Sequence, residues 1–118
     1  MSFLIVDDNR VMRHAIGRVV RDLTDEIIEC ADGAEALLAY QAYLPDWVLM
    51  DIEMTEKDGL TATREICAAF PNARIVIVTN YGDEQMREAA ARAGARGYVM
   101  KENLLELRGI LGRKQAEN

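Results

Sequence analysis

The amino-acid sequence predicts an α/β protein in which five helices cover a doubly wound, five-stranded parallel sheet. Apolar runs of four or five residues recur along the chain. They are nearly continuous in Val, Ile and Leu, as strands covered on both faces require. Segments with helical periodicity separate these runs, so that one strand and one helix together take about 20 to 25 residues. This alternation requires right-handed crossovers between parallel strands.

The first part of the chain contains two strand and helix units. The run Phe3–Val6 is wholly apolar, and the segment Arg10–Leu23 after it carries apolar residues at helical spacing. The run Glu26–Cys30 is a weaker strand because it contains glutamates. It leads to a helix over Ala34–Leu44, where we expect Asp32 to be the N-cap and a glutamate three residues later to complete a capping-box variant.

Three further units follow. The expected strands are Trp47–Met50, Arg74–Val78 and Gly97–Met100. The expected helices are Asp58–Phe70, Asp83–Ala93 and Leu104–Lys114. Pro71 ends the first of these helices because proline cannot continue a helix, and Gly94 suits the residue that follows the second.

Length and charge limit the classes of function. The 118 residues suit one compact domain, residues 1–118. With 20 acidic and 14 basic residues the formal net charge is -6, so we expect no direct nucleic-acid binding by this segment. No run reaches the roughly 18 apolar residues of a membrane span, and the apolar start is too short for a signal peptide. We therefore expect a cytoplasmic protein with no membrane contact.

Polar residues stand directly after four of the expected strands. Asp7 and Asp8 follow the first strand and Asp51 follows the third. Thr79 follows the fourth strand and Lys101 the fifth. Sites in open parallel sheets form outside the carboxyl ends of the strands. We therefore expect three carboxylates, one hydroxyl and one ammonium to meet at one edge of the sheet.

This set of groups fits phosphoryl transfer. Three neighbouring carboxylates repel one another unless a cation holds them together, and an all-oxygen set without His or Cys favours Mg²⁺. The ammonium and the hydroxyl add donors for the oxygens of a transferring phosphoryl group. A carboxylate in such a site can be the nucleophile and become an acyl phosphate.

At these positions the sequence resembles the receiver domain of two-component response regulators. The matching elements, in chain order, are Leu4-Ile-Val-Asp-Asp-Asn9, Leu49-Met-Asp-Ile-Glu-Met54 with Asp58-Gly59, Ile77-Val-Thr79, and Gly94-Ala-Arg-Gly-Tyr-Val-Met-Lys101. The resemblance implies a flavodoxin-like strand order, 2-1-3-4-5. It is greatest to the branch of the family that carries helix-turn-helix output domains.

The resemblance also implies the ligands of a cofactor, Mg²⁺. Asp51 is expected to accept the phosphoryl group from a histidine kinase or phosphotransfer protein. Asp8, Asp51 and the backbone carbonyl of Glu53 are expected to ligate the metal, with Asp7 acting through a metal-bound water. The only histidine, His14, is expected to be a surface or half-buried residue and not the donor.

The remaining implied roles concern signalling. Thr79 and Lys101 are expected to hold phosphoryl oxygens, and Thr79 and Tyr98 to form a switch. The switch would bias the face made by the fourth helix, fifth strand and fifth helix, where effectors or a second copy of the chain would dock. Such a domain is not an enzyme in the usual sense, because it catalyses only its own phosphorylation and dephosphorylation.

Several residues depart from the family pattern or vary within the family. Asn80 stands where a small residue is usual, and we expect Glu53, Asn80 and Tyr81 to border the access to the phosphoryl group. The other departures are Thr55 and Glu102, where prolines are usual, and Lys57, at a commonly apolar position.

Two alternatives stay open at this point. One is a degenerate receiver that binds partners without phosphorylation. The other is a haloacid-dehalogenase-like phosphatase, although that family places its nucleophile loop after the first strand. The arginines of the first helix are expected to form a solvated face, with kinase docking as the alternative; they are Arg10, Arg13, Arg18 and Arg21.

Overall fold

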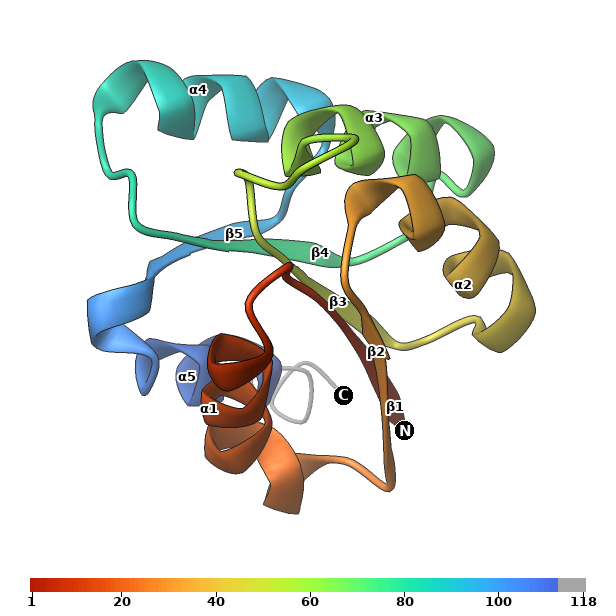
Figure 1. The fold of residues 1–118 in the computed structure, drawn as a ribbon, viewed down its shortest axis with the longest axis vertical. Coiled ribbons are helices and arrows are strands. Elements are labelled where there is room, and N and C mark those ends of the chain that lie inside the picture. The colour runs from red at the N-terminus through yellow and green to blue at the C-terminus, as the bar shows by residue number, and fades with distance from the viewer. Residues whose placement is uncertain (113–118) are drawn as a thin grey trace.

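A five-stranded parallel sheet with strand order β2-β1-β3-β4-β5 forms the centre of the protein (Figure 1). The computed structural model describes residues 1–112. The strands are β1 (Ser2–Val6), β2 (Glu26–Cys30), β3 (Trp47–Met50), β4 (Ile75–Thr79) and β5 (Gly97–Met100). The helices are α1 (Arg10–Val20), α2 (Ala36–Tyr43), α3 (Gly59–Ala69), α4 (Glu84–Ala93) and α5 (Glu106–Gly112). The predicted fold class and strand order are therefore confirmed.

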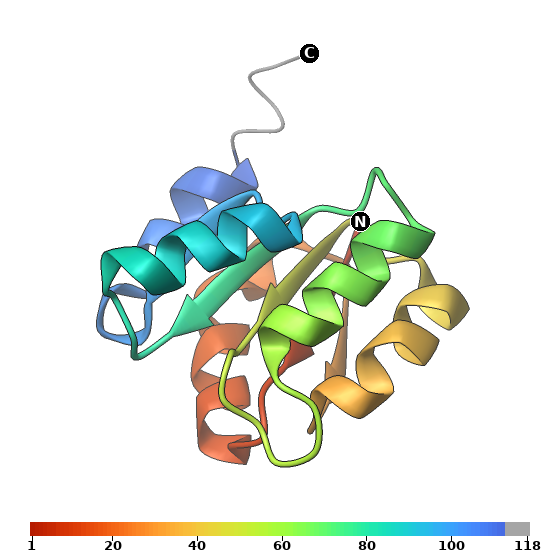
Figure 2. The same cartoon turned by 90° about the horizontal axis from the view of Figure 1, so that it is seen from above.

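The helices lie in two layers. Helices α2, α3 and α4 form a row on one side of the sheet, and α1 and α5 contact each other on the other side (Figure 2). Alternate strand residues serve the two sides: Leu4 and Val6 pack towards α2 and α3, whereas Phe3 and Ile5 pack towards α1 and α5. All four side chains are fully buried. The unbroken apolar runs follow from this, because both faces of the central strands are covered.

The position of β2 explains its weaker apolar pattern. It lies at the edge of the sheet and pairs with β1 alone, from Ser2 opposite Glu26 to Val6 opposite Cys30. Both of its glutamates, Glu26 and Glu29, are exposed. Charged side chains on an edge strand also discourage pairing with another chain.

Side chains and backbone conformation set the helix ends. Asn9 and Asp58 accept hydrogen bonds from backbone N–H groups of the first turns of α1 and α3. Gly94 has a φ of 113° after α4, as expected for a left-handed residue that ends a helix. Leu44 ends α2 in the left-handed region at φ 46° without being a glycine.

Several predicted ends are corrected. Helix α1 ends at Val20, and residues 21–23 form a 3₁₀ turn, as do residues 33–35 before α2 and 101–103 before α5. Helix α5 therefore begins at Glu106, two residues later than expected, and the expected end at Lys114 lies outside the described residues. Strand β4 is shifted by one residue at each end. The capping box is also incomplete, because Glu35 accepts from the N–H of Ala31 and not from that of Asp32.

None of the helices in the described part of the chain has the length and apolar character needed to cross a membrane.

Candidate functional site

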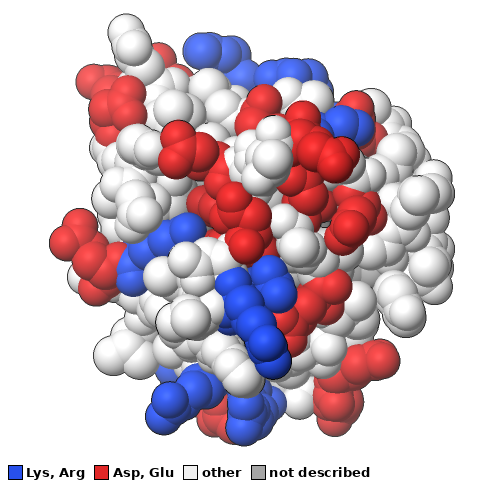
Figure 3. Space-filling view, in the orientation of Figure 1, with Lys and Arg blue, Asp and Glu red and all other residues white. Residues whose placement is uncertain are grey.

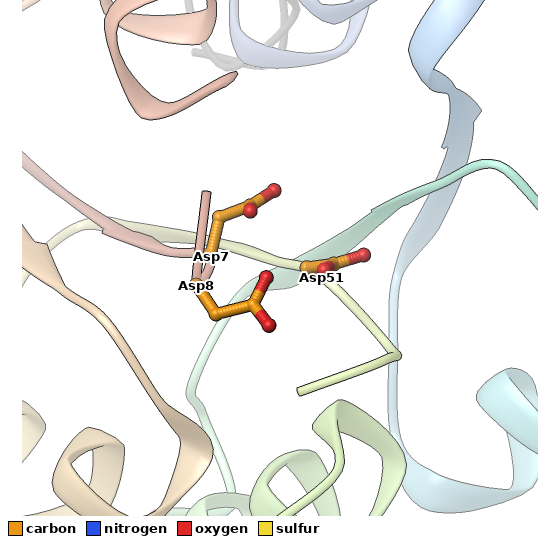
Figure 4. Close-up of side chains that lie close together, drawn as sticks. All are labelled: Asp7, Asp8 and Asp51. Atoms are coloured by element: carbon orange, nitrogen blue, oxygen red, sulfur yellow. The ribbon is translucent and has the colours of Figure 1, made fainter. Parts of the chain in front are cut away.

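Three carboxylates meet where β1 and β3 end. Asp7 and Asp8 follow β1, Asp51 follows β3, and the three side chains lie close together in Figure 4. One oxygen of each carboxylate lies within 4.8 Å of the others. Asp7 and Asp51 are buried, at 0% and 5% exposed, whereas Asp8 is exposed. The structure therefore brings together the three predicted acidic residues.

Lys101 forms ion pairs with both buried carboxylates. Its Nζ lies 3.0 Å from Oδ2 of Asp7 and 3.3 Å from Oδ1 of Asp51, and its side chain is only 9% exposed. The residue begins the 3₁₀ turn directly after β5. Because β5 is the outer strand next to β4, the lysine side chain crosses the edge of the sheet to reach the acids from β1 and β3.

The mixed charges shift the pKa values of the site in a consistent way. Burial and the Asp7 carboxylate raise the pKa of Asp51 to about 6, although Lys101 acts in the opposite direction. Burial opposes the charge of Lys101, but its contacts with Asp7 and Asp51 outweigh this effect and raise its pKa. Lys101 therefore stays an ammonium at neutral pH. Any additional cation at the site would stabilise the ionised form of Asp51.

Backbone contacts hold the acidic side chains in place. The N–H of Asp51 donates to the carbonyl of Val6 at 2.9 Å, so Asp51 continues the pairing of β1 and β3. Its Oδ1 accepts from the N–H of Ile52 at 2.9 Å. Gly59, the first residue of α3, lies so close that a Cβ would stand 1.8 Å from the carbonyl oxygen of Asp51. Only glycine allows α3 to begin there.

The residues present fit a divalent cation. All three acidic groups offer oxygen ligands, the donor set that Mg²⁺ prefers, and the exposed Asp8 leaves the site open to solvent. Acidic side chains also gather in the middle of the face seen in Figure 3, where the loop between β3 and α3 lies. A cleft of about 380 Å³ opens beside them; its lining residues are Asp8, Asn9, Asp51, Glu53, Met54, Thr55, Asn80, Tyr81 and Lys101.

Most of the predicted site residues line the cleft, but not all of them. The three residues expected to border the access, Glu53, Asn80 and Tyr81, all line it. Asp7 and Thr79 are fully buried and are not among the lining residues. Asp7 reaches the site through Lys101, whereas the Thr79 hydroxyl accepts a hydrogen bond from the N–H of Tyr81 at 3.2 Å.

A chain of contacts links the mouth of the cleft to β5. The Tyr81 hydroxyl donates to Oε1 of Glu53 at 2.9 Å. The hydroxyl of Tyr98, from β5, donates to the backbone carbonyl of Tyr81. Above the Tyr98 ring lies the guanidinium of Arg87, 4.5 Å from the ring centre. The residues expected to border access and the residue expected to switch are thus neighbours.

Two contacting residues were not identified as part of the site from sequence. Arg13 is not part of a solvated face as expected, because its side chain is only 15% exposed and NH1 donates to the carbonyl of Asp7 at 2.6 Å. Asp32 was expected only as an N-cap, yet it also accepts from the N–H groups of Glu56 and Lys57. In both cases the contacting residues are more than one helical turn apart in the sequence, so local periodicity could not have predicted these contacts. His14 lies exposed on α1, as expected.

Comparison with known proteins agrees with this geometry. A family model described as the response regulator receiver domain matches residues 3–110. The chemotaxis protein CheY of Halobacterium salinarum is 38% identical over 98 residues, which cover 83% of this chain and 82% of CheY. The oxygen regulatory protein NreC of Staphylococcus aureus is 36% identical over 104 residues, which cover 86% of this chain but 48% of NreC.

Solved structures give the same result. A LuxR-family two-component response regulator from an Aurantimonas species superposes with a TM-score of 0.83 at 30% identity, covering 94% of this chain and 84% of that one. The CheX–CheY complex with beryllofluoride and magnesium from Borrelia burgdorferi gives a TM-score of 0.85 at 25% identity, covering 93% and 88%. The chain described here therefore belongs to the receiver domain family of two-component response regulators.

Proposed function

We propose that this receiver domain is a phosphorylation-dependent signalling switch that accepts a phosphoryl group on Asp51 from a histidine kinase or phosphotransfer protein. The observation that carries the proposal is the pairing of Lys101 with both Asp7 and Asp51 at an open acidic cleft. The domain would catalyse only its own phosphorylation and dephosphorylation. Membership of the receiver family supports this reading over a haloacid-dehalogenase-like phosphatase.

The proposed reaction forms an acyl phosphate. An oxygen of Asp51 attacks phosphorus in line, the bond from phosphorus to the donor imidazole nitrogen breaks, and its electron pair returns to that nitrogen. Lys101 holds a phosphoryl oxygen and compensates the added negative charge. Its raised pKa keeps it charged throughout. Water that reaches the phosphorus from the cleft later hydrolyses the acyl phosphate.

Mg²⁺ would be held by Asp8, Asp51 and the backbone carbonyl of Glu53, with Asp7 acting through a bound water. When bound, the cation supplies positive charge to the phosphoryl oxygens. The exposed position of Asp8 and the presence of Glu53 in the cleft lining support this set of ligands.

The proposed output is a shift of the face formed by α4, β5 and α5. Thr79 would be drawn to the phosphoryl group, which releases its hydroxyl from the Tyr81 N–H and changes the backbone to which Tyr98 is bonded. An output domain, an effector or a second copy of the chain would then dock on this face. The contacts between the cleft mouth and β5 support this route.

The test is chemical labelling. Acetyl phosphate with Mg²⁺ should add one phosphoryl group to the wild type, measured by intact mass, and peptide mapping should place it on Asp51. The Asp51→Asn variant should lose the label, whereas the control Asp58→Asn, a cap on the neighbouring loop, should keep it. Full labelling of Asp51→Asn would refute the assignment. Binding of partners without any labelling would favour the degenerate receiver.

A further inference from the structure

The carboxyl end of β2 contributes no side chain to the cleft, yet it contacts both loops that carry the proposed metal ligands. The first loop follows β1 and holds Asp7 and Asp8. The second joins β3 to α3 and holds Asp51 and Glu53. We call Glu29, Asp32 and Gly33, which lie at the end of β2 and just after it, the β2 corner.

Asp32 holds the second loop. Its Oδ2 accepts from the N–H of Glu56 at 2.9 Å, and its Oδ1 accepts from the N–H groups of Lys57 at 3.0 Å and Ala34 at 2.9 Å. The loop between β3 and α3 lies outside every helix and strand, so the regular structure does not hold its shape. Burial disfavours the charge of Asp32, but these backbone N–H groups lower its pKa, so it stays ionised.

The lack of a side chain at Gly33 allows the segment after β2 to approach the second loop closely. A Cβ at Gly33 would stand 2.4 Å from the carbonyl oxygen of Lys57 and 3.2 Å from that of Asp58. Both clashes are with backbone atoms, which cannot rotate away. The segment after β2 therefore contacts the second loop in two ways, through the backbone at Gly33 and through the hydrogen bonds of Asp32.

Glu29 holds the first loop through Arg13. Its Oε1 accepts from Nε of Arg13 at 2.7 Å, and NH1 of the same guanidinium donates to the carbonyl of Asp7 at 2.6 Å. The N–H of Asp7 donates to the carbonyl of Cys30, the last residue of β2, at 3.1 Å. The peptide groups on both sides of the Asp7 Cα are thus bonded to β2 or to a side chain that β2 orients.

We propose that the β2 corner sets the geometry of the magnesium site, with Asp32 and Arg13 as positioning residues that hold the two ligand-bearing loops at the correct separation. The inference rests on the proposed function, because it assigns these residues to the same site. Groups that hold metal ligands from behind typically change metal affinity by about 10- to 100-fold when they are removed. Thr79 and Lys101 lie on neither loop, and Asp51, at the start of the second loop, is bonded to β1 through its N–H and the carbonyl of Val6, so the chemistry at a filled site should change little.

The test measures Mg²⁺ affinity without any phosphodonor, by following backbone amide resonances during a Mg²⁺ titration. Asp32→Ala and Arg13→Ala should each weaken Mg²⁺ binding by about 10-fold. Labelling of Asp51 by acetyl phosphate at saturating Mg²⁺ should stay within threefold of the wild-type rate. Asp32→Asn keeps one acceptor oxygen, so its affinity should lie between those of Asp32→Ala and the wild type. This variant also serves if Asp32→Ala does not fold.

Matched controls separate positioning from general loss of stability. Asp58→Ala removes another loop carboxylate that caps a helix, through the N–H of Thr61 at 2.8 Å. Arg108→Ala removes another arginine that joins a backbone carbonyl, that of Val19, to a carboxylate, that of Asp22. Both controls should lower the melting temperature while keeping wild-type Mg²⁺ affinity.

The outcomes distinguish this inference from the proposed function. If the wild type is labelled on Asp51 but Asp32→Ala or Arg13→Ala binds Mg²⁺ with wild-type affinity, only the role of the β2 corner is refuted. An equal loss of affinity in the two controls refutes it as well, because loss of stability would then suffice. A wild type that takes no label on Asp51 refutes the proposed function itself.

Discussion

At the scale of single residues, ionisation of Asp51 opposes folding. Burial and the neighbouring Asp7 raise its pKa from 3.8 to about 6. Below about pH 4 the carboxyl is protonated in both the folded and the unfolded state, and the shift has no effect on stability. Between about pH 4 and about pH 6 the folded carboxyl keeps a proton that the unfolded carboxyl has lost, so the free energy of unfolding falls as pH rises through this range.

Asp51→Asn should therefore stabilise the protein at neutral pH when Mg²⁺ is removed with a chelator. The expected gain in the free energy of unfolding is roughly 1 to 3 kcal/mol at pH 7, and it should vanish below about pH 4. Urea unfolding across this pH range measures it. Asp22→Asn, which removes an exposed carboxyl whose pKa is lowered by Arg108, should give no gain. A less stable Asp51→Asn at pH 7 would contradict the sign of the shift.

Asp8 should govern the response to Mg²⁺ because it is the exposed member of the acidic group. Mg²⁺ at ten times its dissociation constant should stabilise the wild type by about 1.4 kcal/mol, since it binds only the folded state. The dissociation constant should be on the order of 1 mM or somewhat below, as expected for carboxylates that repel one another. Asp8→Ala should abolish the stabilisation in a thermal melt. An unchanged Mg²⁺ response would remove Asp8 from the proposed ligands.

At the scale of elements, hydropathy predicted the strands well, and the ends of elements less well. The position of a fully buried strand such as Trp47–Met50 is fixed by its apolar run, because a shift along the sequence would expose apolar side chains. The 3₁₀ turn at residues 21–23 continues the same apolar period as α1, so periodicity could not separate the two. The contacts of Asp32 with Lys57 and of Arg13 with Asp7 depend on how two loops meet. Composition and spacing do not encode that information.

The loop after β4 should control how fast the phosphoryl group is gained and lost. Asn80 and Tyr81 line the cleft, and the Tyr81 hydroxyl spans it to Glu53. Asn80→Ala and Tyr81→Ala should each speed labelling by acetyl phosphate and decay of the acyl phosphate by about 3- to 30-fold. Rapid-mixing kinetics measure both rates.

Tyr81→Phe separates bulk from bonding at this loop. It keeps the ring but removes the hydrogen bond to Glu53, so rates near wild type would identify the ring as the shield, and rates near those of Tyr81→Ala would identify the bond. Slower or unchanged rates in both alanine variants would show that these side chains do not limit access.

At the scale of the whole molecule, the sheet separates two apolar clusters. The site lies beyond both clusters, at the carboxyl ends of the strands. Sequence reasoning placed the carboxylates and Lys101 at this edge, because the carboxyl ends of parallel strands share it. It did not predict that Asp7 and Thr79 are fully buried and do not line the cleft. Their contacts come from residues outside the two strands, Arg13 of α1 for Asp7 and Tyr81 after β4 for Thr79.

The effect of phosphorylation should travel across the molecule from β4 to β5. Beryllofluoride with Mg²⁺ imitates the phosphoryl group, and it should shift backbone amide resonances throughout residues 80–104, including Arg87 and Tyr98. These residues form a connected path through the Tyr98 bond to Tyr81 and the Arg87 stack on Tyr98. Amides of α2 serve as the control and should shift little. Changes confined to the residues of the cleft would contradict the switch.

The position of Lys101 has one further consequence, for the exchange of the metal. Its ammonium is a counterion tethered to the chain, 3.0 and 3.3 Å from two of the carboxylates that an incoming cation would share. Mg²⁺ bound as proposed would therefore compete with a positive charge that is part of the chain and repels it at close range. The Lys101 ammonium would stabilise the metal-free domain and would limit the affinity of the site for the metal. We therefore expect the domain to stay folded without the metal and to release the metal readily.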